Sequence, residues 1–280
     1  MTTLTPATDR ILPSPLPDAS TSFLTATAQT ARRTLLQFAR TPQLLVMPPL
    51  IAGLFLVIFR YVFGGAIDAG GSVSYVDFLI PGFLAQTVLW NAMNVPAGVA
   101  EDSSSGVYDR LRSLPIPRAA VMAGRALADT ALNAWGLAVT ALLGFAVGFR
   151  THADLAEVIV AFALMLAMIY AFSWLFISLG LRAGNAQAAQ GLSTLIVVPL
   201  TFVSGAFVPI NSMPGWMQPF AENQPVTVMI NAVRSLMLGG AELAGIGHTT
   251  TYWVLLSLVW CAGIVAVFGT VAVTRFSRTR

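Results

Sequence analysis

The longest polar, charge-bearing break between apolar runs beyond the N-terminal tail reads EDSSSGVYDRLRSLPIPR and covers residues Glu101 to Arg118. Two acidic residues and three serines open this segment, and two prolines close it. In a helix between them, Val107, Leu111 and Leu114 share one face, at spacings of four and three residues. We therefore predict a short, two-faced helix whose N-cap comes from the serines at 103–105. Such a helix can dock in a groove of a soluble partner, or it can serve only as a linker.

The composition is that of a protein that crosses a membrane several times. Of its 280 residues, 56% are hydrophobic and 10% are charged, whereas soluble domains carry about 25% charged residues. A helix needs about 20 apolar residues to cross the hydrocarbon core. We predict an all-α integral membrane protein with six transmembrane helices, over Leu44–Phe63, Phe78–Val99, Ala119–Phe149, Leu155–Leu181, Gly191–Val208 and Tyr252–Val273.

Prolines mark the first two of these helices. Pro48 and Pro49 are expected in the opening turns of the first helix, where missing backbone donors matter least. Pro81 and Pro96 lie in the second helix, which also carries several side-chain amides. We expect that helix to be kinked.

The N-terminal region divides into two parts. Residues 1–22 are rich in Pro, Thr and Ser and lack an apolar core, which predicts a disordered cytoplasmic tail. Residues 23–42 predict an amphipathic helix. Its apolar positions are Leu24, Ala28, Ala31, Leu35 and Phe38, and its polar stripe is Gln29, Arg33, Gln37 and Arg40. Such a basic helix is suited to lie flat at the membrane surface, although an ordinary packed helix would show the same pattern.

Between the last two spans, Pro209–His248 is moderately apolar and broken by four prolines. We predict short helices over Met213–Phe220 and Thr227–Leu238, the second capped by its own first residue and ended by Gly239-Gly240. Joined at Asn223-Gln224-Pro225, they suit a re-entrant hairpin that dips into the outer leaflet. Such backbone must pack against protein, because lipid cannot satisfy it. A plain external loop is the alternative.

The arginines set the expected orientation. All 15 basic residues are arginine, and six spans would place both termini on one side. That side then holds Arg10, Arg32, Arg33, Arg40, Arg110, Arg112, Arg118, Arg125, Arg182, Arg275, Arg278 and Arg280. The other side holds only Arg60, Arg150 and Arg234. The positive-inside rule places both termini and the Glu101–Arg118 segment in the cytoplasm.

Several kinds of chemistry are excluded or disfavoured. The chain has no lysine, so it cannot form a P-loop, whose lysine reaches the nucleotide phosphates. The single Cys261 excludes an intrachain disulfide. His152 and His248 lack a second ligand at metal spacing, and we expect no metal site. The net charge of +3 gives no reason to expect nucleic acid as a partner.

Polar side chains inside the spans are candidates for a transport path, because ionisable groups there usually face protein or water. Arg125, Asp129 and Asn133 fall on one helix face. The first two can simply form a structural ion pair near the cytoplasmic interface, which we favour over a substrate role. The candidates for a path are Gln86, Asn91, Asn94, Asp129 and Asn133, and the amides can equally bond between helices.

Two blocks resemble the permeases of type-2 ABC exporters, most of all the actinobacterial daunorubicin-resistance branch. GVYDRLRSLPIPR is similar to the pattern that this branch carries after its second span. The second block comprises Asn185-Ala-Gln187 and PLTFVSGAFVPINSMPGWMQPFAENQPVTVMINAVRSLMLGG from Pro199 to Gly240. The resemblance covers roughly residue 23 to the C-terminus. The serines at 103–105 depart from it, since many relatives have a more charged run there.

The resemblance implies a type-2 ABC transmembrane domain over residues 43–280, with residues 23–42 as its connecting helix. Coupling to an ATPase on a separate chain would involve Glu101, Val107, Tyr108, Arg110, Leu111, Arg112 and Leu114. An outer re-entrant gate would include Pro209, Pro214, Trp216, Asn223, Pro225 and Arg234. Two permeases, as identical copies or paralogues, would pair with two ATPase subunits. Those subunits would use ATP and Mg, and this chain would bind no cofactor.

We expect an ATP-driven exporter permease in the plasma membrane that moves a hydrophobic or amphipathic substrate, such as a drug-like polyketide or a lipid, outward. Export of a polysaccharide or glycolipid is the alternative within the family. A membrane-bound lipid-linked transferase would need clustered acids for magnesium, whereas the 12 acids here are scattered. An ATP-independent carrier would transport without an ATPase partner.

Overall fold

The computed structural model describes residues 22–63, 75–206, 210, 213–240 and 247–278. These residues form helices and turns and no strand, as the all-α prediction requires. The predicted tail, except for its last residue, lies outside the described residues, and so does Pro209.

The helices are, in chain order, α1 Phe23–Ala39, α2 Pro42–Ile58 with a π-helical turn at Phe59–Phe63, α3 Tyr75–Ala92, α4 Val95–Ser104, α5 Val107–Arg112, α6 Arg118–Val147, α7 Leu155–Gly180, α8 Ala186–Val203, α9 Gln218–Asn223, α10 Pro225–Met237 and α11 Thr250–Arg278. Among the described residues, five segments are long and apolar enough to cross a membrane, namely α2 with its extension, α6, α7, α8 and α11. The chain is therefore a multi-pass membrane protein.

The second expected span is divided between α3 and α4. The chain turns at Met93-Asn94, and Pro96 lies in the first turn of α4. The predicted kink is thus a full interruption, because proline fits the opening turn of a helix better than its interior.

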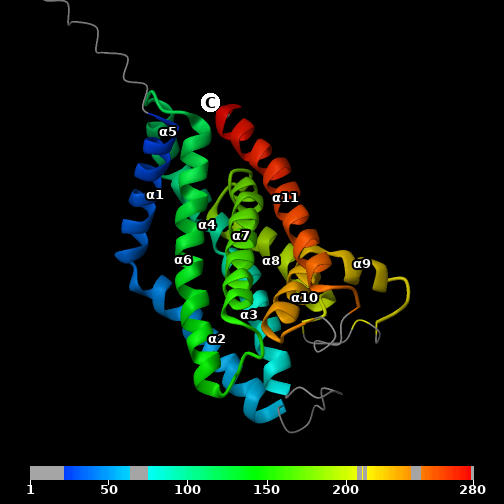
Figure 1. The fold of residues 1–280 in the computed structure, drawn as a ribbon. Coiled ribbons are helices and arrows are strands. Elements are labelled where there is room, and N and C mark those ends of the chain that lie inside the picture. Colours follow the sequence, from blue (N-terminus) through cyan, green and yellow to red (C-terminus); the bar gives the residue numbers. More distant parts are fainter. Residues whose placement is uncertain (1–21, 64–74, 207–209, 211–212, 241–246, 279–280) are drawn as a thin grey trace, which may run out of the picture.

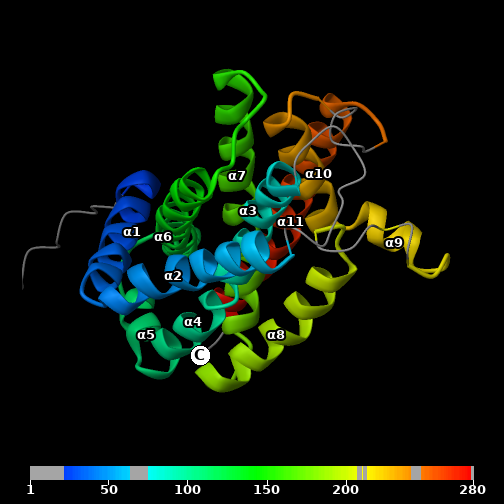
Figure 2. The ribbon, with the colours of Figure 1, turned by 90° about the horizontal axis from the view of Figure 1, so that it is seen from below.

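The long helices run side by side, and the ends of the bundle differ (Figure 1). Helices α1 and α5 and the C-terminal end of α11 lie at one end. The turn between α6 and α7 lies at the other end. Seen from below, α6 lies on one side of α2 and α8 on the other (Figure 2).

Glycines allow the closest helix contacts. At Gly180, in α7, an added Cβ would lie 2.7 Å from the Pro96 carbonyl oxygen and 2.7 Å from Val99 Cβ, so only glycine lets α4 approach this closely. At Gly124, in α6, an added Cβ would lie 2.6 Å from the Thr27 carbonyl oxygen of α1. Small residues at helix contacts are typical of membrane proteins.

Helix α1 packs on α6 through a face that its leucine pattern did not indicate. The buried residues are Ala26, Thr27, Thr30, Thr34 and Phe38. Of the expected apolar positions, Phe38 is buried, whereas Leu24 and Leu35 are exposed. The face of α1 that packs on α6 therefore consists mostly of small residues, and the leucines lie on the exposed surface of the helix.

The two prolines of α2 lie deeper than predicted, because the helix begins at Pro42 rather than at Leu44. Pro49 cannot donate a hydrogen bond to the Leu45 carbonyl oxygen one turn earlier. The Trp135 indole of α6 donates to that oxygen instead, at 3.2 Å. A side chain from the neighbouring helix thus replaces the missing backbone donor.

The bounds of the remaining spans follow the predictions unevenly. Helices α6 and α7 match their expected ranges within two residues at each end. Helix α8 begins at Ala186, five residues earlier than the expected Gly191, and ends at Val203, five residues before the expected Val208. The reason for the early start is Asn185, whose side chain accepts a hydrogen bond from the Ala188 amide at 2.8 Å and caps the helix.

Candidate functional site

The Glu101–Arg118 segment folds differently from the single helix that we predicted. Residues 101–104 form the last turn of α4, and α5 begins only at Val107. Gly106 lies between them with a φ of 72°, a left-handed conformation that glycine adopts readily. The serine N-cap is therefore wrong, because Gly106 occupies the N-cap position of α5.

Helix α5 rests on the C-terminal end of α11 through Tyr108. This tyrosine is 2% exposed, and its ring lies edge-on to Phe276 with 5.5 Å between centroids. Its hydroxyl has no hydrogen-bond partner among the described residues. Burial raises the pKa of Tyr108 above its ordinary value, so the phenol stays neutral.

The predicted apolar stripe of this segment is divided between two surroundings. Val107 and Leu111 pack partly against the hydrophobic core. Leu114 lies beyond the end of α5 and is 50% exposed, and Arg110 is exposed as well. The surface that remains for a partner therefore includes Leu114, Arg110 and the exposed Glu101.

Arg112 is engaged within the chain. Its Nε donates to the Phe276 carbonyl oxygen at 3.0 Å, and its guanidinium carbon lies 4.7 Å from the centre of the Phe276 ring. Its Nη1 lies 2.7 Å from an Asp109 carboxylate oxygen. Arg118 donates to the Ser277 carbonyl oxygen at 2.9 Å. Both arginines satisfy carbonyls at the end of α11, where cations are favourable.

An ion-pair cluster, formed by the buried Asp102, Arg125 and Asp129 and the partly exposed Arg33, joins α1, α4 and α6. Arg125 Nη1 lies 2.9 Å from Asp102 Oδ2, and Arg125 Nε lies 3.0 Å from Asp129 Oδ2. Arg33 Nη2, from α1, approaches Asp102 Oδ1 at 3.4 Å. The predicted pair of Arg125 and Asp129 is confirmed. The position of Asp102 differs from the prediction, since it lies in the last turn of α4 and not at a helix start.

Space for this cluster comes from Gly98 of α4. An added Cβ there would lie 2.6 Å from Arg125 Nη2. The guanidinium therefore lies against the α4 backbone while it binds the carboxylate of Asp102 on the same helix. Movement of α4 is thus linked directly to α6.

A cavity of about 730 Å³ lies among α2, α3 and α8. Its lining includes the aromatic side chains Phe55, Phe59, Phe83, Trp90 and Phe202 and the amides of Gln86, Asn91 and Asn94. Trp90 and Phe202 are also exposed, so the cavity lies at the surface of the subunit. A mostly apolar wall with a few amides suits an amphipathic molecule.

The amides of the expected path have different neighbours. Gln86 Nε2 donates to Thr201 Oγ1 of α8 at 2.6 Å, so this side chain also bonds between helices. Asn91 and Asn94 line the large cavity and share a second cavity of about 40 Å³ with Asn133. Asp129 lines neither of these cavities and belongs to the ion-pair cluster.

The region expected as a re-entrant hairpin contains α9 and the almost wholly buried α10. Gln224 is the N-cap residue of α10 and Pro225 its first residue, so the predicted cap at Thr227 is wrong. Proline is well suited to that first position. The predicted end is confirmed, since Gly239 and Gly240 both have positive φ values.

Arg234 of α10 is a second buried arginine. Its guanidinium donates to the carbonyl oxygens of Gly205 and Ala206, just after α8, at 2.9 and 3.1 Å. An added Cβ at Gly82 of α3 would lie 2.6 Å from Arg234 Nη2. Arg234 thereby joins α10, α3 and the end of α8.

The other residues named for the outer gate lie at the surface or at helix ends. Pro214, Trp216 and Asn223 are exposed. Asn223 offers its carbonyl oxygen to the Trp260 indole of α11 at 3.1 Å. Within the described ranges no group of three potential metal ligands is found.

The chain is similar to transporter permeases along most of its length. Residues 25–238 match the family model described as ABC-2 type transporter. The daunorubicin resistance ABC transporter permease protein DrrB1 of Streptomyces coeruleorubidus is 33% identical over 252 residues, which cover 89% of this chain and 85% of the relative. The probable doxorubicin resistance ABC transporter permease protein DrrC of Mycobacterium tuberculosis is 27% identical over 274 residues, which cover 95% of each.

Another relative is the inner membrane transport permease YadH of Escherichia coli K12, 28% identical over 222 residues, which cover 78% of this chain and 83% of the relative. The family match includes the ion-pair cluster, the cavity and α10. The resemblance that we drew from the two sequence blocks is confirmed. The chain therefore belongs to the ABC-2 type transporter family, as a membrane permease.

Proposed function

We propose that this chain moves a hydrophobic or amphipathic substrate outward across the plasma membrane, driven by ATPase subunits on separate chains. The single observation that carries the proposal is the cavity of about 730 Å³ among α2, α3 and α8. Its aromatic walls can receive the apolar body of a substrate, and the amides of Asn91 and Asn94 can bind its polar groups. A drug-like polyketide has this character, and the similarity to the daunorubicin resistance permease DrrB1 supports it.

The working unit in this proposal contains two permeases, as copies or paralogues, and two ATPase subunits. The interrupted pair α3 and α4 acts as one of six spans, which puts both termini in the cytoplasm. Figure 1 is consistent with that arrangement, because the arginine-bearing helices α1 and α5 lie at the same end as the C-terminal end of α11. The open side of the cavity suits a path completed by the second permease.

Coupling begins at α5 and the residues beside it. The exposed Leu114 and Arg110 meet the ATPase, while Val107 and Leu111 hold α5 to the core. Motion of this segment reaches α11 through Tyr108 and Phe276. It reaches α6 through the ion pair of Asp102 and Arg125, and α6 packs against α2 and α3, two of the helices that line the cavity.

Bulk added to the cavity tests the transport proposal. Met47→Trp places an indole in the lining, whereas Val46→Trp adds the same bulk one position away, at a similarly exposed residue that does not line the cavity. With the ATPase present, inside-out vesicles should show ATP-driven uptake of daunorubicin that Met47→Trp reduces at least tenfold and Val46→Trp leaves near the unsubstituted level. Equal uptake by both variants would contradict the role of the cavity.

A glycolipid is the second candidate substrate. The five aromatic side chains in the lining favour it, because sugar rings stack on aromatic faces. Direct uptake of a labelled glycolipid tests this candidate. ATP-driven glycolipid uptake that Met47→Trp abolishes and Val46→Trp preserves would identify the cavity as its site.

A further inference from the structure

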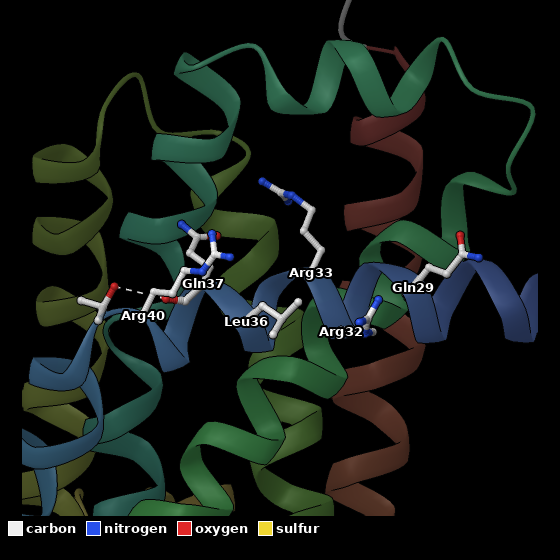
Figure 3. A pocket seen from close by; sticks show the side chains of 7 residues that line it. Gln29, Arg32, Arg33, Leu36, Gln37 and Arg40 are labelled. Carbon is white, nitrogen blue, oxygen red and sulfur yellow. Dashed lines mark hydrogen bonds between the residues drawn. The ribbon is translucent and has the colours of Figure 1, made fainter.

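One side of α1 forms a groove that neither the large cavity nor the export proposal uses. The groove has a volume of about 540 Å³ and ends at Thr41. Its other lining residues are Gln29, Arg32, Arg33, Leu36, Gln37 and Arg40. These positions recur at intervals of three and four residues, so they share one side of the helix. Figure 3 shows their side chains projecting from α1, with the Thr41 hydroxyl donating to the Gln37 carbonyl oxygen.

All the charged residues that line the groove are positively charged. Three arginines line it and no acidic residue does. Arg33 reaches Asp102 at 3.4 Å, but its side chain is still 39% exposed. Arg32 and Arg40 are exposed and form no ion pair within the described part of the chain. Like charges on one helix face repel one another, so an anion from the surroundings would stabilise this face.

The position of the groove along the chain sets its depth in the membrane. Arg40 lies two residues before Pro42, the first residue of the apolar span α2. The Leu44 amide donates to the Thr41 carbonyl oxygen at 3.0 Å, so the end of the groove adjoins the first turn of α2. Leu36 in the groove is exposed, and Val46 and Leu50 are exposed along α2. Charged and apolar surfaces therefore meet at the junction of α1 and α2.

We propose that this groove binds the phosphate headgroup of an anionic phospholipid, whose acyl chains lie along the exposed side of α2. Guanidinium groups bind phosphate oxygens through two parallel hydrogen bonds. The amides of Gln29 and Gln37 supply donors and acceptors for a headgroup hydroxyl. An acidic segment of a partner protein would bind the arginines but not the apolar surface beside them. An anionic phospholipid would bind both, so we favour the lipid as the occupant of the groove.

Binding of short-chain lipids to the purified full chain in a neutral detergent tests the proposal. Dioctanoyl phosphatidylglycerol is titrated against dioctanoyl phosphatidylcholine, and the dissociation constants are measured by thermophoresis. Arg32→Gln and Arg40→Gln should each weaken phosphatidylglycerol binding about fivefold, since each arginine near a membrane surface contributes about 1 kcal/mol. Arg33 is left intact because it contacts Asp102.

The matched control is Arg182→Gln, which removes an exposed arginine after α7 and outside the groove. It should leave phosphatidylglycerol binding unchanged, and neither groove variant should alter phosphatidylcholine binding or the melting temperature without lipid. Equal weakening in all three variants would overturn the proposal, and so would inorganic phosphate that competes as well as the lipid. Loss of a co-purified ATPase subunit with unchanged lipid affinity would also overturn it and assign the groove to that partner.

Discussion

Two buried arginines, at different places in the bundle, are held in different ways. Arg125 lies between the carboxylates of Asp102 and Asp129, whereas Arg234 donates to the backbone carbonyls of Gly205 and Ala206. Both guanidinium groups lie against a glycine, where an added Cβ would be 2.6 Å from Nη2. In both places a glycine makes room for the guanidinium, although Arg125 binds carboxylates and Arg234 binds backbone carbonyls. The first arginine links side chains of α4 and α6, and the second fastens α10 to the end of α8.

Removal of Arg125 should have the largest effect. Arg125→Leu leaves two buried carboxylates without their main partner, which typically costs about 3–5 kcal/mol. We expect most of the protein to be lost from the monodisperse peak in detergent size-exclusion chromatography. The exposed Arg110→Leu should keep that peak. A normal peak for Arg125→Leu would show that the ion-pair cluster is not needed for folding.

Removal of Arg234 should cost less, because the partners that its guanidinium binds at Gly205 and Ala206 are neutral carbonyls rather than charges. Loss of a hydrogen bond to a charged group typically costs about 1.5–3 kcal/mol. Arg234→Leu should therefore keep a larger monodisperse peak than Arg125→Leu but melt well below the unsubstituted protein. A smaller monodisperse peak for Arg234→Leu than for Arg125→Leu would contradict the comparison.

Alanine at either glycine sharpens the same comparison without removing an arginine. Gly98→Ala and Gly82→Ala each force a guanidinium away from its partners, and overpacking of this kind costs about 1–3 kcal/mol. Gly191→Ala in α8 meets no atom within 4 Å and should be neutral or stabilising. Melting temperatures of the three variants provide the measurement. Similar melting temperatures for all three variants would show that the close contacts at Gly98 and Gly82 do not determine stability.

The smallest effect is expected at Tyr108, the uncharged neighbour of the ion-pair cluster. Its hydroxyl has no partner within the described residues, so Tyr108→Phe should change stability by less than about 0.5 kcal/mol near neutral pH. The folded-state pKa is raised by burial. Stability is therefore complete below the unfolded pKa of about 10 and falls as the pH rises above it. Melting curves between pH 8 and 11 should show a shallower decline in Tyr108→Phe, and identical slopes would contradict the buried phenol.

In the ion-pair cluster, the contact between residues close in the sequence could be predicted, and the contacts between residues far apart in the sequence could not. Arg125 and Asp129 are four residues apart on one helix, so their pairing follows from helical geometry. Asp102 is 23 residues from Arg125 and 69 from Arg33, and only the packing of α4, α6 and α1 brings these side chains together.

The ends of the helices also divide into those that the sequence predicts closely and those that it does not. The uninterrupted apolar runs predicted α6 and α7 closely, because they carry no competing local signal. The start of α8 and the division at Ser105-Gly106 depend on single residues with capping or left-handed conformations. Of the proposed transport residues, Asn91, Asn94 and Gln86 do reach one cavity, but Asp129 does not line it. Periodicity could not distinguish these roles, since each residue is simply a polar side chain in an apolar run.

The central claim is that the pair of Asp102 and Arg125 transmits motion from α5 to the transport path. The most direct test is the number of substrate molecules exported per ATP hydrolysed, in proteoliposomes that contain this chain and its ATPase. Asp102→Asn keeps the shape of the side chain and removes its charge, and Asp154→Asn makes the same change at an exposed site before α7. We predict that Asp102→Asn lowers this ratio at least fivefold while ATP hydrolysis continues, and that Asp154→Asn leaves it unchanged. An unchanged ratio in Asp102→Asn would contradict the claim.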